Sequence, residues 1–222
     1  FFAGHSLGEY SALCCAESIN FEQTIRLLKH RGESMQSAMP KGEGGMMAIL
    51  GLNINQINEI FQINKDKFKC FVANDNSNGQ IVISGKVNSL ELLGDELKKK
   101  KIKFITLPVS APFHSPLMNN ATNEMKEIIN NTNLFDPIIN IVSNVTGKPV
   151  NDSSEIKKLL INQIEKPVRW RESVINMIKF GTNKFIEVGP GKVLSGLVKR
   201  IDTNVKLKQV NNLSDINNLI ND

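Results

Sequence analysis

The pentapeptide Gly4-His5-Ser6-Leu7-Gly8 has the G-x-S-x-G spacing of a nucleophile elbow, in which a serine sits on a sharp turn between a strand and a helix. Apolar residues 1–3 precede it, and residues 7–17 have a small-residue, helical composition. Glycines two residues either side of Ser6 would remove side chains that clash across the turn. The N–H groups that begin the helix would stabilise an oxyanion there. The alternative is a glycine-rich turn with an incidental serine.

A nucleophilic serine needs a general base, and the chain has three histidines. His5 adjoins Ser6, so their side chains should diverge at the turn. His30 lies in the predicted helix 21–36, and we expect a surface or structural role for it. His114 lies in a loop between two prolines, which restrict the backbone and would fix the direction of the ring. Sequence spacing alone does not bring His114 to Ser6.

Arg31 belongs to the same predicted helix, residues 21–36. Four apolar residues recur there at helical spacing and predict a face buried against a sheet: Phe21, Ile25, Leu28 and Met35. Arg31 falls at the edge of this stripe, where its stem would lie along apolar surface and its guanidinium would face a cleft.

The predicted elements divide the chain into two kinds of structure. Residues 46–110 predict strands at 46–52, 69–75, 80–85 and 103–110, with helices at 53–63 and 89–101. This β-α-β-β-α-β order is typical of a ferredoxin-like unit, to which we assign residues 43–110. Residues 1–42 and 111–222 alternate helices with strands, for example a strand at 139–144, and predict an α/β domain with parallel pairing.

The composition narrows the classes of protein. The chain has 222 residues, 41% hydrophobic and 22% charged, which predicts a packed fold. A net charge of +5 favours an acidic partner and is low for a nucleic-acid-binding protein. Cys14, Cys15 and Cys70 are odd in number and lack CxxC spacing, so we expect no disulfide framework, no metal site and a reducing, cytoplasmic location. No apolar run reaches the ~18 residues that span a membrane.

Four segments together resemble the malonyl-CoA:acyl carrier protein transacylase family, which loads malonyl groups for fatty-acid synthesis. They occur in the family's order, at residues 4–13 (GHSLGEYSAL), 30–36 (HRGESMQ), 109–115 (VSAPFHS) and 187–194 (EVGPGKVL). The resemblance covers the whole chain. It implies an α/β-hydrolase-like core with an inserted ferredoxin-like subdomain, which agrees with the predicted order of elements.

The resemblance also implies roles for individual residues. Ser6 would be the nucleophile that becomes malonylated, and His114 its base, oriented by the backbone carbonyl of Gln163. Leu7 would supply an oxyanion-hole N–H. Arg31 would bind the free carboxylate of malonate through two parallel N–H bonds, which lysine could not reproduce, and would reject acyl groups that lack this carboxylate.

Other residues match the family less specifically. Phe113 resembles a position where a bulky ring would crowd a 2-methyl group of the acyl chain. Asn74 and Asn76 match positions that line the cleft, with turn residues before a strand as the alternative. The stretch 189–192 (GPGK) predicts a tight turn and is not a Walker A sequence. Trp170 is expected in the core.

The expected partners are malonyl-CoA and an acidic acyl carrier protein, which brings its own phosphopantetheine, with no other cofactor and no metal. Lys192, Lys199 and Arg200 are candidate docking charges. We expect a monomer.

Family members begin with a strand and a Gly-Gln-Gly-Ser-Gln-like loop that completes the oxyanion hole, and this sequence has neither. We therefore expect a fragment of a longer product. Two alternatives stay open: a serine esterase or thioesterase of the α/β-hydrolase type, and a non-catalytic remnant that binds the carrier protein.

Overall fold

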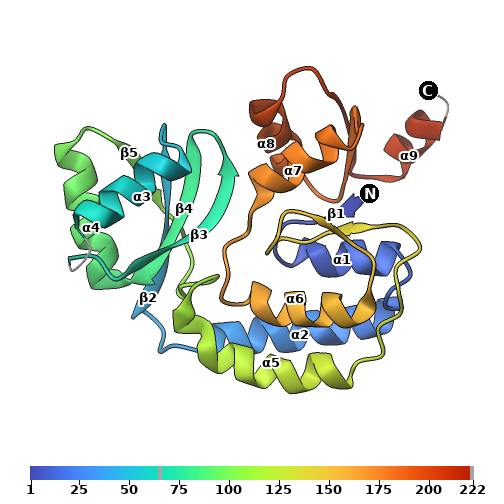
Figure 1. Cartoon of the computed structure of the whole chain (residues 1–222), viewed down its shortest axis with the longest axis horizontal. Helices are drawn as coiled ribbons and strands as arrows, with labels where there is room; N and C mark the ends of the chain where they lie inside the picture. Colours follow the sequence, from blue (N-terminus) through green and yellow to red (C-terminus); the bar gives the residue numbers. More distant parts are fainter. Residues whose placement is uncertain (65–66, 221–222) are drawn as a thin grey trace.

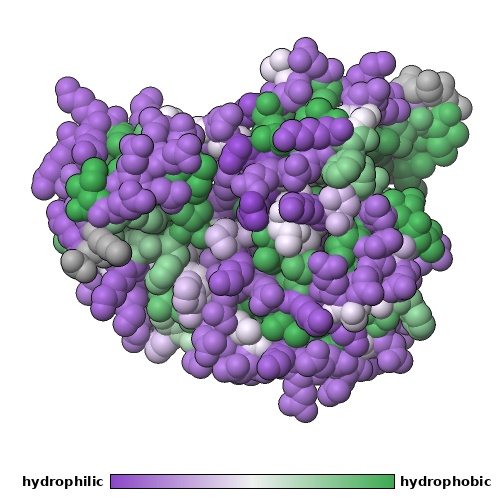
Figure 2. Space-filling view, viewed as in Figure 1, coloured by the Kyte–Doolittle hydropathy of each residue, from purple (hydrophilic) through white to green (hydrophobic). Residues whose placement is uncertain are grey.

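The computed structural model describes residues 1–64 and 67–220 and has two lobes (Figure 1). One lobe contains the strands and helices between residues 44 and 106, and the other contains the segments before and after them. The fold is mixed α/β, with both parallel and antiparallel strand pairs. The visible surface is mostly hydrophilic and is hollowed at its upper edge between the lobes (Figure 2). Within the described residues, no helix is long and apolar enough to cross a membrane.

The smaller lobe is a four-stranded sheet with two helices. Its strands are β2 (Gly44–Leu50), β3 (Cys70–Ser77), β4 (Gln80–Lys86) and β5 (Lys103–Thr106), in the order β3-β4-β2-β5 with every pair antiparallel. Helices α3 (Ile54–Ile63) and α4 (Val87–Lys99) connect them. The elements follow one another in the predicted order, although the last strand ends at Thr106 instead of residue 110.

Both faces of this sheet are buried. Successive residues of a strand point to opposite sides, so neighbouring residues belong to different clusters. Met47 and Ile49 of β2 pack on the side of α3 and α4. Met46 and Ala48, which alternate with them along β2, belong to a second cluster, against which Phe113 packs from outside the lobe. The second face of the sheet therefore lies against the segment that carries His114.

The larger lobe surrounds a small sheet of β1 (Phe2–Ala3), β6 (Ile141–Val142) and β7 (Pro149–Val150), in the order β1-β6-β7. β1 and β6 are parallel, as predicted, but β7 was not predicted and pairs antiparallel with β6. The strand expected over 139–144 is shorter because the chain turns back after Val142. Ser143 N–H donates to the carbonyl of Lys148, and Gly147 takes a φ of 65° in this turn.

Helices α1 (Gly8–Cys15), α2 (Phe21–Ser37), α5 (Asn119–Asn131) and α6 (Ser153–Gln163) enclose the main core of this lobe, and the short 3-10 helix η1 (Pro116–Met118) leads into α5. The buried face of α2 agrees with the prediction at Met35, which is 3% exposed, and at Leu28, which packs against the main core, but differs at the start of the helix. Phe21 is 72% exposed and Ile25 is 50% exposed. Thr24, Leu27 and Arg31 are buried instead, because α2 presents this face to α1, α5 and the Ser6 region.

The C-terminal segment adds α7 (Trp170–Lys179), β8 (Lys184–Val188), α8 (Val193–Ile201), β9 (Lys206–Val210) and α9 (Leu213–Ile220). β8 and β9 are parallel, as the intervening helix predicts, and they form a separate two-stranded sheet. Trp170 is 4% exposed and packs with Val142 and Leu197, which confirms its predicted place in the core.

Candidate active site

Ser6 lies on the turn between β1 and α1, as the G-x-S-x-G spacing predicts. Its φ is 53°, a left-handed conformation that non-glycine residues rarely adopt. A Cβ at Gly4 would lie 1.9 Å from the carbonyl oxygen of Gly8, so the turn requires glycine at position 4. A Cβ at Gly8 would meet no atom within 4 Å. The expectation that both glycines relieve a clash is therefore wrong for Gly8.

The tertiary structure brings His114 to Ser6 across 108 residues of sequence. The distance from Ser6 Oγ to His114 Nε2 is 2.7 Å, and that from His114 Nδ1 to the backbone oxygen of Gln163 is 2.8 Å. Because a carbonyl only accepts, Nδ1 carries the proton and Nε2 is the acceptor for the serine hydroxyl. Burial, helped by the charge of Arg31, lowers the pKa of His114 to about 3. The imidazole is therefore a neutral base at physiological pH.

Arg31 reaches the same point from α2. Its Nη2 donates to Ser6 Oγ at 2.9 Å and to Gln163 Oε1 at 3.0 Å. The residue is only 6% exposed, its Nε has no acceptor, and its guanidinium carbon lies 5.7 Å from the ring centroid of Tyr10. Burial lowers its pKa. Across residues 1–64 and 67–220, no carboxylate lies within salt-bridge distance of Arg31, although the buried Glu9 interacts with it through space. A buried cation therefore faces the serine without a carboxylate in direct contact.

Two amide side chains hold the elbow in place. Asn144 Oδ1 accepts from Ser6 N–H, and Asn144 Nδ2 donates to the carbonyl of Gly4, both at 2.7 Å. Gln163 Nε2 donates to the carbonyl of Ser6 at 3.0 Å. Asn144 had no role in the sequence analysis. The available signal was its position just after the apolar strand β6, where the ends of parallel strands gather polar groups.

Comparison with known proteins identifies the family. Residues 1–214 match the family described as acyl transferase domain. The malonyl CoA-acyl carrier protein transacylase of Bacillus subtilis (strain 168) is 41% identical over 208 residues, which cover 93% of this chain and 66% of that protein. The protein of that name from Staphylococcus aureus (strain MSSA476) is 38% identical over 220 residues, 97% of this chain and 71% of the relative. The chain belongs to the malonyl CoA-acyl carrier protein transacylase family.

Solved structures of family members have the same fold. The transacylase of Clostridium perfringens superimposes with a TM-score of 0.93 at 39% identity, over 99% of this chain and 69% of that one. A malonyl-transacylase in complex with a type II PKS acyl-carrier protein gives 0.93 at 38% identity, over 99% of this chain and 72% of that one. This family member spans about two thirds of the length of the curated relatives.

The remaining predicted site residues of this acyltransferase lie around the serine turn. Asn76 Oδ1 lies 2.8 Å from Nε2 of His5, so His5 is held away from Ser6. Asn74 and Asn76 are buried within β3, and their interpretation as turn residues is wrong. Within the described residues, no hydrogen bond joins Asn74 to Ser6. Phe113, half-buried, packs against the clusters of both lobes.

Residues 189–192 form the predicted tight turn, and the N–H groups that follow it already bind a carboxylate of this chain. Gly189 and Gly191 have φ values of 131° and 91°, and Lys192 is the N-cap of α8. The carboxylate of Glu187 accepts from the N–H groups of Leu194 and Ser195 at 2.9 and 2.7 Å. Because an internal carboxylate already uses these donors, this helix terminus is not a phosphate site.

The candidate docking charges lie on α8. Lys199 and Arg200 lie in its last turn. Arg200 donates to Gln80 Oε1 of the smaller lobe at 2.8 Å, so this side chain bridges the two lobes. Elsewhere in the part of the chain that the structure describes, no cluster of three or more His, Cys, Asp or Glu residues could hold a metal ion.

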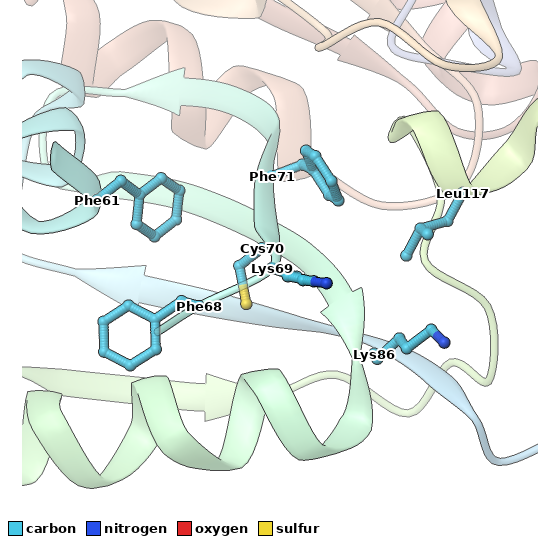
Figure 3. Close-up of a pocket in the computed structure, with 7 residues that line it drawn as sticks. All are labelled: Phe61, Phe68, Lys69, Cys70, Phe71, Lys86 and Leu117. Carbon is cyan, nitrogen blue, oxygen red and sulfur yellow. The ribbon is translucent and has the colours of Figure 1, made fainter. Parts of the chain in front are cut away.

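A cavity of about 400 Å³ lies between the smaller lobe and η1 (Figure 3). Aromatic side chains dominate its wall, and the two lysines extend toward the side of Leu117. It is lined by Phe61, Phe68, Lys69, Cys70, Phe71, Lys86 and Leu117. Because this lining contains neither Ser6 nor His114, the cavity is separate from the Ser6–His114 pair.

Proposed function

We propose that this chain transfers a malonyl group from malonyl-CoA to the phosphopantetheine thiol of an acyl carrier protein, through a malonyl ester of Ser6. The observation that carries the proposal is the buried guanidinium of Arg31, 2.9 Å from Ser6 Oγ and without a carboxylate partner in the described residues. A dicarboxylic acyl group would bring the missing anion to the serine. An unsubstituted acyl group would not.

In the first half-reaction, Ser6 Oγ attacks the thioester carbonyl while His114 Nε2 takes the hydroxyl proton. The tetrahedral oxyanion would be stabilised by the N–H of Leu7, which donates no hydrogen bond among the described residues. Collapse breaks the C–S bond, and the coenzyme A thiolate leaves with the proton from His114. In the second half-reaction the carrier thiol gives its proton to His114 and attacks the malonyl ester, and Ser6 recovers its proton.

The proposed selectivity comes from Arg31. A guanidinium binds a carboxylate through two parallel N–H bonds, and a low-polarity site strengthens this interaction. Leaving the buried charge unpaired, as with an acetyl group, carries a penalty of several kcal/mol. We also propose that Phe113 limits the size of the acyl group. Phe113 directly precedes His114, and its ring would crowd a substituent on the acyl chain.

The finer description of the fold is also a proposal. We assign residues 1–42 and 111–222 to an α/β-hydrolase-like core and residues 43–110 to a ferredoxin-like subdomain. The fully antiparallel order β3-β4-β2-β5 supports the subdomain, and the parallel pairs β1·β6 and β8·β9 support the core. We also propose a monomer in the cytoplasm, with Lys192 and Lys199 facing an acidic carrier protein. The three cysteines are free, as a reducing compartment requires.

The direct test is intact-mass spectrometry of the chain after brief exposure to malonyl-CoA. We expect one malonyl adduct that is absent from a Ser6→Ala variant and is discharged when a carrier protein with a free phosphopantetheine thiol is added. Release as free malonate in water, without transfer to the thiol, would instead identify a thioesterase. Carrier binding without any adduct would refute catalysis by this chain and favour the binding remnant.

A further inference from the structure

Glu9 is a buried carboxylate inside the nucleophile turn. It lies in the first turn of α1, three residues after Ser6, and is 2% exposed. Its Oε2 accepts two hydrogen bonds, from Gln163 Nε2 at 2.7 Å and from the N–H of Asn144 at 3.1 Å. Both donors belong to the residues that hold the backbone of Ser6. Burying a carboxylate costs free energy unless hydrogen bonds compensate for the lost water. The two contacts of Glu9 indicate what the buried carboxylate does.

The first contact determines which way the amide of Gln163 points. With Nε2 directed at Glu9 and at the carbonyl of Ser6, Oε1 faces Arg31 Nη2 at 3.0 Å. A flipped amide would place Oε1 against the Glu9 carboxylate and Nε2 against the guanidinium. Two donors would then face each other at Arg31 and, while Glu9 is ionised, two acceptors would face each other at Glu9, so both contacts would be repulsive.

The second contact holds Asn144. Its N–H is bound by Glu9, while its side chain accepts from Ser6 N–H and donates to Gly4. Glu9 thus accepts hydrogen bonds from both residues that hold the backbone of the Ser6 turn.

We propose that Glu9 is a positioning residue for acyl transfer, which orients the Gln163 amide and, through it and Asn144, holds Ser6 and Arg31 in reactive geometry. This inference rests on the proposed function, because the reaction being supported is acylation of Ser6. Within the described residues, Glu9 makes no hydrogen bond to the serine hydroxyl or to His114. Its effect must pass through the two amides.

The interaction survives a change of protonation. Burial raises the pKa of Glu9 to about 7, against the opposing influence of Gln163, Asn144 and Arg31. The neighbouring ionisable group is Tyr10, whose own pKa burial raises to about 12. A protonated carboxyl keeps one carbonyl oxygen as acceptor, so either form can bind both donors through Oε2.

The test is a double-mutant cycle with Glu9→Met and Gln163→Met, because glutamine at position 9 would keep a carbonyl oxygen that accepts both hydrogen bonds. Methionine removes both polar ends of Gln163 and leaves its backbone carbonyl for His114. Ser6 labelling is followed by intact mass with two reagents, malonyl-CoA and a fluorophosphonate that needs only an activated serine. Glu33→Gln, an exposed change on α2, is the matched control.

We expect each single variant to label about 10- to 100-fold more slowly, the effect of leaving buried donors without their acceptor. The double variant should be at least about fivefold faster than the product of the two losses predicts, because both remove one network. A Glu9→Met rate within twofold of the parent, or losses that multiply, would overturn the proposal. A merely structural role would lower the melting temperature without this coupling. If Glu9→Met does not fold, Glu9→Asp enters the cycle instead.

The two reagents separate this proposal from the proposed function. A parent chain that reacts with the fluorophosphonate but not with malonyl-CoA would refute malonyl transfer and still allow the cycle to be measured. A parent chain that reacts with neither would overturn both.

Discussion

Replacing Arg31 with alanine should abolish the preference for malonyl over acetyl groups. The guanidinium is 6% exposed and lies 2.9 Å from Ser6 Oγ, so an acyl group on the serine brings its substituent into contact with the cation. Removing one partner of a buried ion pair costs ~3–5 kcal/mol. At ~1.4 kcal/mol per factor of ten, kcat/KM for malonyl-CoA should fall by roughly 10²- to 10³-fold or more.

Acetyl-CoA should respond differently, because it has no carboxylate to lose. In the parent chain an acetyl group leaves the buried charge of Arg31 uncompensated, whereas alanine removes that charge. The rate with acetyl-CoA should therefore stay level or rise, and the ratio of the two rates should fall by at least the factor lost with malonyl-CoA. An equimolar mixture of the two thioesters, read by intact mass at Ser6, measures this ratio directly.

The control is Arg26→Ala, which removes an exposed arginine of the same helix, paired with Glu22 at the surface. It should leave the ratio unchanged. The reasoning is refuted if Arg31→Ala acylates Ser6 with the parent's ratio, since the guanidinium would then not bind the substrate carboxylate. Equal losses with both thioesters would also refute it, because Arg31 would then act on Ser6 alone.

The pKa of about 3 for His114 predicts that Ser6 acylation stays level from about pH 7 to about pH 5; a fall centred near 6.5 would contradict this. The pKa of His114 is about 3 in the folded chain and 6.5 in the unfolded chain, so between these values the unfolded chain binds more protons. The free energy of unfolding therefore falls as pH drops from 6.5 toward 3. His114→Asn should flatten the acid side of a melting-temperature profile. Gly4→Ala should cost about 3 kcal/mol or more and Gly8→Ala almost nothing in denaturant unfolding, because only the first Cβ meets backbone; similar losses would refute that account. Arg171→Ala removes a bidentate partner of the buried Asp75 and should cost ~3 kcal/mol by the same assay, and a loss under ~1 kcal/mol would show the pair to be solvated.

Local signals predicted much of the fold. Hydrophobic periodicity and turn residues located the smaller lobe because each strand and helix there is formed by neighbouring residues in sequence. The same reasoning was right for Leu28 and Met35 of α2 but wrong for Phe21 and Ile25, which are exposed. Periodicity reports which residues are apolar, but the buried face also depends on what the helix packs against. Here that surface includes the Ser6 turn, and the buried Arg31 donates a hydrogen bond to Ser6 Oγ.

Within the site, the same division holds. The Ser6 turn follows from the sequence by itself, because G-x-S-x-G describes a local backbone conformation that Gly4 makes possible. The hydrogen bonds that hold this turn do not follow from the local sequence. Glu9 stands in the same motif, yet its partners Asn144 and Gln163 are 135 and 154 residues away, and nothing local identifies them.

The sequence by itself therefore determined the serine turn, the order of the elements and, through motifs shared with a family, the chemistry to expect. Only the tertiary structure decided that His114 Nε2 meets Ser6 Oγ at 2.7 Å, that the carbonyl of Gln163 sets its tautomer, and that Arg31 lies buried beside them. The physical reason is that hydrogen bonds and burial act between atoms in space. Residues far apart in the chain acquire a shared chemistry only when the packing of both lobes brings them together.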